Sequence, residues 1–139
     1  MDNVAVVYWS GGGNTAAMAE AIANGLRQSG AGADIFNVAS SDLSSILSYD
    51  KIAFGCPSMG DEVLEESEFE PYFQSIEAGL GNKKIALFGS YGWGDGLWMR
   101  EWESRVNESD ANFFEKGFIQ QESPDETECE AFGARFAGF

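Results

Sequence analysis

Residues 4–15 read VAVVYWSGGGNT, an apolar run that leads directly into a serine, three glycines, an asparagine and a threonine. The run Val4–Trp9 has the pattern of a β-strand that is buried on both faces. From Ala16 to Gln28 the chain is rich in alanine, and larger apolar residues recur every four positions, as in an amphipathic helix. The stretch therefore predicts a strand, a glycine-rich turn and a helix, the first unit of a parallel α/β fold.

The rest of the chain repeats this alternation of apolar strands and amphipathic helices. Further strands are predicted at Ala33–Val38, Lys51–Cys56, Lys84–Gly89 and Asn112–Gln120. Helices are predicted at Phe69–Ala78, Leu97–Val106 and Asp125–Phe136, and a helical turn or short helix at Asp42–Leu47, with Ser40 or Ser41 as its cap. No repeat, linker or low-complexity tract interrupts the pattern. We therefore expect a single domain over residues 1–139, with one parallel sheet covered by helices on both faces.

The charge balance restricts the partners that the protein can bind. The chain has 23 acidic and 8 basic residues, for a net charge of −15, and 44% of its residues are hydrophobic. Such an acidic protein cannot neutralise the phosphates of a nucleic acid and is repelled by anionic lipid, so we expect neither partner. It attracts basic proteins over long range. The N-terminus lacks the features of a signal peptide and no apolar run reaches membrane-spanning length, which favours a cytoplasmic protein.

Two kinds of site are excluded by the residues that the chain lacks. It has no histidine, which removes imidazole-dependent triads and His-ligated zinc. Its two cysteines, Cys56 and Cys129, form neither a CxxC motif nor a metal pattern. Cys56 ends an apolar run, and Cys129 shares a helical stripe with Phe132 and Phe136. We therefore expect both cysteines to be reduced core residues, and we expect no metal site.

The glycine-rich turn at Ser10–Thr15 has the chemistry of an anion site. A turn between a strand and a helix presents backbone N–H groups and the positive end of the helix dipole, and both attract phosphate. A nucleoside triphosphate loop would need a lysine, and none is present in this turn. A dinucleotide fingerprint is formally present as Gly11-x-Gly13-x-x-Ala16, but Asn37 stands where that motif expects an acid.

A phosphate monoester fits this turn better than either alternative. Because the turn contains no cation, a dianionic phosphate must be matched by about half a dozen hydrogen-bond donors. The glycines supply accessible backbone N–H groups, and Ser10, Asn14 and Thr15 add hydroxyl and amide groups. A purely structural turn with a capping residue would need only one or two glycines, so we expect a phosphate site.

Two further loops follow predicted strands at the same edge of the sheet. Residues 56–68 follow the strand at Lys51–Cys56, and residues 89–97 follow the strand at Lys84–Gly89. In parallel α/β sheets, ligands bind outside the carboxyl ends of the strands, at the point where the strand order reverses. The three loops are therefore expected to form one ligand site.

In this order the three loops resemble those of flavodoxins, small electron carriers that bind flavin mononucleotide (FMN). The sequence VVYWSGGGNTAAMAEAI at 6–22 looks like the N-terminal signature of that family, and CPSMGDE at 56–62 and SYGWGDG at 90–96 stand where the family builds its flavin pocket. The resemblance covers the whole chain, and the last strand enters its helix with no inserted loop, as in short-chain flavodoxins. It implies a doubly wound five-stranded parallel sheet of order 2-1-3-4-5. One departure is Gly12, where the family usually has threonine.

The resemblance implies an FMN site built from all three loops. The phosphate would lie in the first loop, formed by Ser10, Gly11, Gly12, Gly13, Asn14 and Thr15. The rest of the cofactor would be held by the second and third loops, through Pro57, Ser58, Met59, Gly60, Asp61 and Glu62 and through Ser90, Tyr91, Gly92, Trp93 and Gly94.

Two side chains are expected to cover the faces of the flavin ring. Trp93 stands between Gly92 and Gly94, so it can lie flush against one face without interference from neighbouring side chains. Met59 is an adaptable, polarizable cover for the other face. Tyr91 competes with Trp93 for the stacking role, and the resemblance to short-chain flavodoxins favours Trp93.

Other positions are expected to tune the cofactor and bind its edges. In flavodoxins the peptide between the residues matching Gly60 and Asp61 reverses on reduction, and its carbonyl then accepts a hydrogen bond from N5 of the flavin semiquinone. Glycine tolerates the positive φ that such a reversal requires. The backbone of Asp61 and Glu62 is expected at the pyrimidine edge, Ser90 near the phosphate and Ser58 near the ribityl chain.

Residues 61–70 contain six acids, which we expect to disfavour a fully reduced anionic flavin and to provide a docking face. The implied function is a low-potential one-electron carrier with non-covalently bound FMN, which alternates between semiquinone and hydroquinone and passes electrons between redox enzymes. The expected partners are basic faces of reductases and oxidoreductases, docked transiently by a monomer.

Two other functions are less well supported by the sequence. An FMN-dependent reductase needs a flavin face open to nicotinamide, and here Met59 and Trp93 would cover both faces. A phosphoacceptor receiver needs an acid at the end of the third strand, where Gly55 and Cys56 stand. We therefore expect a carrier and not an enzyme with its own substrate turnover.

Overall fold

In the computed structural model, which describes residues 3–139, strands and helices alternate along the chain. The strands are β1 (Asn3–Tyr8), β2 (Gly32–Asn37), β3 (Lys51–Gly55), β4 (Lys84–Tyr91), β5 (Asn112–Phe113) and β6 (Phe118–Gln121). The helices are α1 (Asn14–Gln28), α2 (Phe69–Ile76), α3 (Leu97–Glu108) and α4 (Glu126–Ala137), with single 3₁₀ turns at η1 (Ile46–Ser48) and η2 (Glu77–Gly79). The predicted α/β alternation is confirmed.

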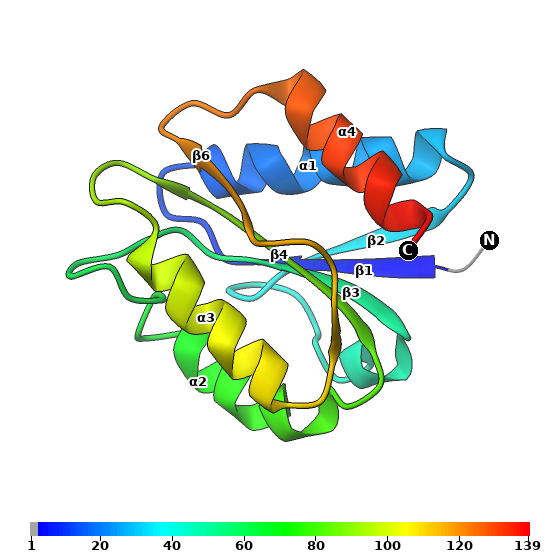
Figure 1. Ribbon diagram of the computed structural model, residues 1–139, viewed down its shortest axis with the longest axis horizontal. Helices are drawn as coiled ribbons and strands as arrows, with labels where there is room; N and C mark the ends of the chain where they lie inside the picture. The colour runs from blue at the N-terminus through cyan, green and yellow to red at the C-terminus, as the bar shows by residue number, and fades with distance from the viewer. Residues whose placement is uncertain (1–2) are drawn as a thin grey trace.

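All strand pairs of the sheet are parallel, and the strand order is β2-β1-β3-β4 followed by β5 and β6, which both pair with β4. Helices α1 and α4 cover one face of the sheet, and α2 and α3 cover the other (Figure 1). The predicted doubly wound sheet of order 2-1-3-4-5 is therefore confirmed, with β5 and β6 sharing the fifth position. None of the helices within residues 3–139 has the length and apolar character needed to cross a bilayer.

The fifth strand is interrupted, so the prediction of one continuous strand at Asn112–Gln120 is wrong. β5 pairs with the start of β4, and β6 pairs with its end. Between them Glu115 has a φ of 52°, in the left-handed region. The N–H of Gly117 donates a hydrogen bond to the Glu103 carboxylate on α3 instead of to a neighbouring strand. The side chain of Phe114 is buried in the core. These side-chain interactions outweigh the strand ladder, and the apolar pattern does not reveal them.

Before β3 the structure has a helical turn, the first of the two alternatives predicted for Asp42–Leu47, and not a short helix. The turn is the 3₁₀ element η1, which overlaps only the end of the predicted segment. Ser41, one of the two expected caps, bonds elsewhere, because its hydroxyl accepts from the N–H of Asn37. The carboxylate of Asp42 accepts from the N–H of Ser44. Short polar side chains that bond to nearby backbone in this way compete with helix formation.

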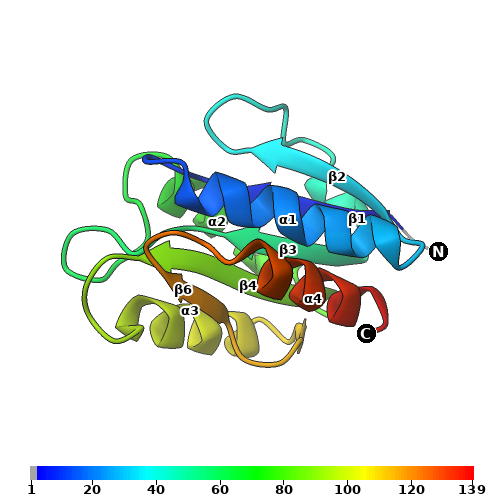
Figure 2. The same ribbon diagram turned by 90° about the horizontal axis from the view of Figure 1, so that it is seen from above.

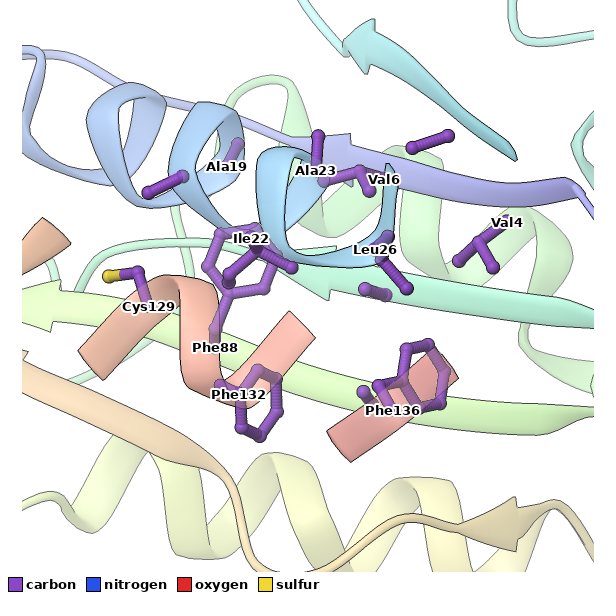
Figure 3. Close-up of a cluster of buried hydrophobic side chains, with 14 of the residues drawn as sticks. Val4, Val6, Ala19, Ile22, Ala23, Leu26, Phe88, Cys129, Phe132 and Phe136 are labelled. Carbon is purple, nitrogen blue, oxygen red and sulfur yellow. The ribbon is translucent and has the colours of Figure 1, made fainter. Parts of the chain in front are cut away.

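The core on the α1–α4 face depends on close approach of the two helices. Ile22 and Leu26 of α1 lie beside Phe132 and Phe136 of α4, over the side chains of the sheet (Figure 3). Gly25 and Gly133 make this approach possible. A Cβ atom at Gly25 would lie 2.0 Å from the carbonyl oxygen of Glu130, and one at Gly133 would lie 2.1 Å from that of Ile22.

Both cysteines are free and buried, as predicted. Cys56 lies in the core on the α2–α3 face, and Cys129, a residue of α4, lies in the core on the α1–α4 face. Burial raises the pKa of the Cys56 thiol, and burial together with the Asp125 carboxylate raises the pKa of Cys129 to about 12. Both groups are therefore unreactive thiols at neutral pH.

We predict that Gly25→Ala lowers the free energy of unfolding by about 1–3 kcal/mol, because the new methyl group meets the backbone of α4. The substitution by itself would favour the helix by about 1 kcal/mol, so a loss of stability isolates the contact between the helices. Asn24→Ala, at the neighbouring exposed position, should stabilise slightly. Urea unfolding of both variants measures the difference, and a Gly25→Ala variant as stable as Asn24→Ala would contradict the prediction.

Candidate functional site

Three loops meet at the carboxyl edge of the sheet. Tyr8 of β1 is in register with Gly55 of β3, so the loops that follow these strands start side by side. The N–H of Ser58 donates to the carbonyl of Ser90 at 3.0 Å, which joins the loop after β3 to the end of β4. Both views show the loops after β1, β3 and β4 at one end of the molecule (Figures 1 and 2). The structure thus brings the predicted site residues together.

The first loop is shaped as an anion cradle. Its chain turns so that the Ser10 hydroxyl accepts from the N–H of Gly13 at 3.1 Å, and Gly13 adopts a φ of 100° before α1 begins at Asn14. Within residues 3–139, no acceptor bonds to the N–H groups of Gly11 and Gly12. They stand free at the positive end of a 15-residue helix, which is the arrangement that binds phosphate.

The glycines of this loop differ in what they can tolerate. A Cβ atom at Gly11 would approach the indole of Trp9 to 3.2 Å, and Gly13 requires a positive φ. Gly12 has no positive φ, and a Cβ atom there would have no neighbour within 4 Å. Gly12 is therefore the position of the loop that could accept a larger residue.

Behind the loop, the hydroxyls of Thr15 and Ser90 form a hydrogen bond of 2.9 Å. Both side chains are buried, and the bond ties the first turn of α1 to the last residues of β4. Asn14, by contrast, is exposed. The structure places Ser90 behind Thr15, where it can fix the orientation of the Thr15 hydroxyl.

The second loop contains a tight turn closed by two hydrogen bonds. The N–H of Met59 donates to the carbonyl of Val63 at 2.9 Å, and the N–H of Val63 donates back at 3.0 Å. Inside the turn Gly60 has a φ of 51° and Glu62 a φ of 57°. A Cβ atom at Gly60 would have no neighbour within 4 Å, so the constraint on this residue comes from its backbone conformation alone.

The carboxylate of Glu62 joins the second loop to the third. It accepts hydrogen bonds of 3.2 Å from the N–H groups of Asp95 and Gly96, at the start of α3. These bonds hold a non-glycine residue in the left-handed region, which by itself costs about 1 kcal/mol or more. The sequence predicts a role only for the backbone of Glu62, and no pattern in it indicates this bridge by a buried side chain.

The expected ring covers lie on the surface of the second and third loops. Trp93 is 62% exposed and Met59 is 37% exposed, which is unusual for large apolar side chains. Tyr91 is half-buried, and its ring lies 5.6 Å from that of Trp98 in the core. Tyr91 therefore packs inward, and Trp93 is the aromatic side chain available to a ligand.

The six acids of residues 61–70 do not form one uniform charged face. Glu65 is buried, and its carboxylate accepts from the N–H groups of Glu68 and Phe69 at 2.7 and 2.9 Å and from Ser67. Burial alone would raise the pKa of Glu65, but the hydrogen bonds from Ser67, Phe69 and Glu68 outweigh it and hold the pKa below its ordinary value of 4.5. Glu65 thus caps α2.

Other members of the acidic segment have partners in neighbouring elements. Glu68 accepts from the indole N–H of Trp9 at 2.9 Å, a contact between the acidic segment and the first loop that the sequence does not predict. Glu70 and Glu77 both bind Arg105, and hydrogen bonds from its guanidinium to them raise the pKa of Arg105. No cluster of acidic and cysteine side chains in residues 3–139 is arranged to hold a metal ion.

The site fits a flat, phosphorylated ligand. Free N–H groups at a helix start suit a phosphate, and exposed apolar side chains on two adjoining loops suit a ring. The open space at Gly12, Gly60 and Gly92 lets a ligand approach the backbone closely. Together these features define a doubly wound α/β protein with a mononucleotide-type site at the switch point between β1 and β3.

The chain belongs to the flavodoxin family, in its short-chain form, and the family model "Flavodoxin" matches residues 6–133. A flavodoxin of Clostridium beijerinckii is 49% identical over 134 residues, which cover 95% of this chain and 97% of that protein. A flavodoxin of Megasphaera elsdenii is 38% identical over 130 residues, covering 94% and 95% of the two chains.

The solution structure of the two-electron reduced Megasphaera elsdenii flavodoxin has a TM-score of 0.88 to this chain at 39% identity, and the match covers 98% of this chain and 99% of that one. Flavodoxins are FMN-containing low-potential electron carriers that exchange electrons with redox proteins, and they are not enzymes. The fold, cofactor and general function implied by the sequence are thereby confirmed.

We predict that Glu65→Ala lowers the free energy of unfolding by about 1–3 kcal/mol at pH 7, because several backbone N–H groups at the start of α2 lose their acceptor. The pKa of Glu65 is lowered in the folded state, so its contribution is present above pH 4.5 and is lost as the pH falls through the folded-state pKa. The difference between Glu65→Ala and wild type should therefore shrink between pH 5 and pH 3.

The exposed neighbour Glu66 provides the control. Glu66→Ala should change the stability by less than about 0.5 kcal/mol. Denaturant unfolding at several pH values measures both variants. If Glu65→Ala lowers the free energy of unfolding by the same amount at pH 7 and pH 3, the charge of Glu65 does not stabilise the start of α2.

Proposed function

We propose that FMN is held non-covalently by the three loops at the carboxyl edge of the sheet. The observation that carries this proposal is that the first loop, with its free N–H groups, and the third loop, with Trp93 62% exposed, both lie at this edge. The residues assigned to the cofactor are Ser10, Gly11, Gly12, Gly13, Asn14, Thr15, Pro57, Ser58, Met59, Gly60, Asp61, Glu62, Ser90, Tyr91, Gly92, Trp93 and Gly94. Once bound, FMN supplies a centre that takes up and releases single electrons.

In this assignment the phosphate is bound without a cation. The N–H groups of the first loop and the dipole of α1 provide the positive potential. The hydroxyl of Ser10 and the amide of Asn14 complete the donor set, and Ser90 orients Thr15 through their hydrogen bond. These donors carry no charge, but their dipoles point toward the ligand. The site therefore attracts an anion even though the protein carries a net charge of −15.

Met59 and Trp93 enclose the ring from two loops whose separation is set by Glu62. With both faces covered, no face is left for nicotinamide to stack, which fits a carrier rather than a reductase. Tyr91 supports the third loop from behind through its contact with Trp98. The N–H groups of Asp61 and Glu62 are assigned to the polar edge of the ring, and the Ser58 hydroxyl to the ribityl chain.

Gly60 is assigned a redox-tuning role. It occupies the left-handed region at a φ of 51°, and glycine adopts positive and negative φ about equally readily. The peptide between Gly60 and Asp61 can therefore present either its carbonyl or its N–H to the cofactor. Such a change in hydrogen bonding stabilises one charge state of the cofactor over another and separates the two one-electron potentials.

The carrier is proposed to act as a cytoplasmic monomer that docks transiently onto basic redox proteins. Asp61 and Glu66 are exposed on the second loop, and they give the site end of the molecule a negative rim. Complementary charges accelerate encounter without producing a long-lived complex. The two free, buried thiols are compatible with a reducing compartment.

FMN titration of the apoprotein tests the phosphate assignment. We predict that Gly12→Thr tightens FMN binding by about 0.5–1.5 kcal/mol, because Gly12 has no positive φ and has free space for a hydroxyl that adds one hydrogen bond. Riboflavin, which lacks the phosphate, should bind equally to wild type and variant. Quenching of flavin fluorescence by Trp93 reports both affinities, and equal changes for the two ligands would reject the first loop as the phosphate site.

We predict that Gly60→Thr leaves FMN bound but narrows the gap between the two one-electron potentials by about 90 mV. A cost of about 1 kcal/mol in the one-electron state moves the two potentials by about 43 mV each in opposite directions. Gly60→Ala, which lacks the β-branch, should narrow the gap less. Spectroelectrochemical titration measures the gap, and an unchanged gap in Gly60→Thr would refute the role of this peptide.

A further inference from the structure

Large apolar side chains are exposed mainly at one end of the molecule. Leu47 and Phe139 lie elsewhere, and the four others named among the exposed large hydrophobic residues lie on the loops after β3 and β4. They are Met59, Val63, Trp93 and Leu97. Concentrated exposure of this kind on a small protein marks a binding surface.

Two of these side chains have no role in the proposed flavin site. Val63 is 36% exposed and Leu97 is 40% exposed. They lie on either side of one hydrogen bond, because Glu62 precedes Val63 and accepts from the N–H of Gly96, which precedes Leu97. This bond joins the two loops that carry Val63 and Leu97, the same loops that carry Met59 and Trp93.

The core does not require Leu97 or Val63. Helix α3 buries Trp98, Met99 and Trp102 against the sheet, and Leu97 lies on its exposed side. Glu101 is one turn further along that side and is also exposed, which is the usual kind of residue for such a position. An exposed leucine in the first turn is thus unexplained by folding.

Charge around this pair favours one kind of partner. The exposed acids Asp61 and Glu66 lie near Val63 in the chain, and Glu101 lies one turn from Leu97. Arg100, a cation at this end, is paired with Asp95 at 3.0 Å. Val63 and Glu101 line one hollow, so acids adjoin the apolar pair on that side. The exposed Lys116 lines a separate hollow with Gly96 and Arg100.

The opposite end of the molecule carries several of the cations. Lys51 and Lys84 begin β3 and β4, and Arg27 and Arg135 lie in the last turns of α1 and α4. Because the helices run antiparallel to the strands, these positions share the amino edge of the sheet. This uneven distribution of charge between the two ends orients the acidic end toward a positively charged partner surface. The net charge of −15 opposes association with a second copy of the protein.

We propose that Val63 and Leu97, with Asp61, Glu66 and Glu101 around them, form the docking surface for a basic redox protein. The partner places an apolar patch framed by lysines or arginines on this pair. The acids accelerate encounter, and burial of the two side chains stabilises the docked state. The inference rests on the proposed function, and it assigns the contact residues that the acidic rim alone does not identify.

Electron transfer from the FMN-loaded protein to cytochrome c, a basic haem protein, tests the proposal. In each transfer the electrochemically reduced flavin loses one electron and the ferric haem iron gains it. Stopped-flow rates are measured from 50 to 500 mM salt. Val63→Ser and Leu97→Ser should each lower the second-order rate about fivefold at 500 mM salt, where charges are screened, and should leave the salt dependence unchanged.

Variants that remove a charge should lower the rate mainly at low salt, whereas the apolar variants lower it at high salt as well. Glu66→Gln and Glu101→Gln should lower the rate at 50 mM salt, reduce its dependence on salt and have little effect at 500 mM. Leu47→Ser is the matched apolar control, because Leu47 is also 40% exposed but lies on η1, before β3. It should transfer electrons at the wild-type rate throughout.

Flavin content and midpoint potentials of every variant are measured first. Failure of the wild type to bind FMN would overturn both the proposed function and the docking surface. Normal flavin content and potentials with wild-type rates for Val63→Ser and Leu97→Ser would overturn the docking surface alone. A wild-type dimer that Leu97→Ser dissociates, seen by sedimentation, would assign the surface to a second copy and also overturn the proposal.

Discussion

A parallel sheet ends all of its strands at one edge, and the connecting helices run back from that edge with their N-termini toward it. In this protein the constraint places the first turn of α1, the Gly60 turn and the start of α3 together. Each contributes unpaired backbone groups or bare backbone, so the edge has anion affinity before any side chain is considered. A chain with far more acids than bases can therefore belong to a family that binds a phosphorylated cofactor.

The acidic segment after β3 shows how one composition can contain several different physical roles. Glu62 joins two loops, Glu65 caps a helix and Glu70 is neutralised by Arg105. Asp61 and Glu66 remain exposed to solvent. The six acids of residues 61–70 therefore do not all have the same electrostatic effect. The buried carboxylates position backbone, and the exposed ones set the surface potential.

Most of the fold could be predicted from the sequence because apolar strands and helical spacing are local patterns. The strands at Val4–Trp9, Lys51–Cys56 and Lys84–Gly89 were predicted to within a few residues of the observed bounds. The break in the fifth strand was not predicted, because it depends on the bond from Gly117 to Glu103, two residues on different elements. The site loops were predicted from their glycines, whereas the contacts of Trp9 and Glu65 are side-chain geometry that no spacing encodes.

The glycine contact between α1 and α4 has a consequence for the far end of the helix. Gly25 lies 11 residues from Asn14, about 17 Å along the helix axis at 1.5 Å per residue. Helix α1 packs tightly against α4 near its C-terminal end, so a change in that contact would tilt the whole helix. A tilt of about 5° at that contact would move the phosphate loop by about 1.5 Å, half the length of a hydrogen bond. The close contact of Gly25 on α1 with α4 thus helps to align the anion cradle, together with the hydrogen bond between Thr15 and Ser90 at the N-terminal end of the helix.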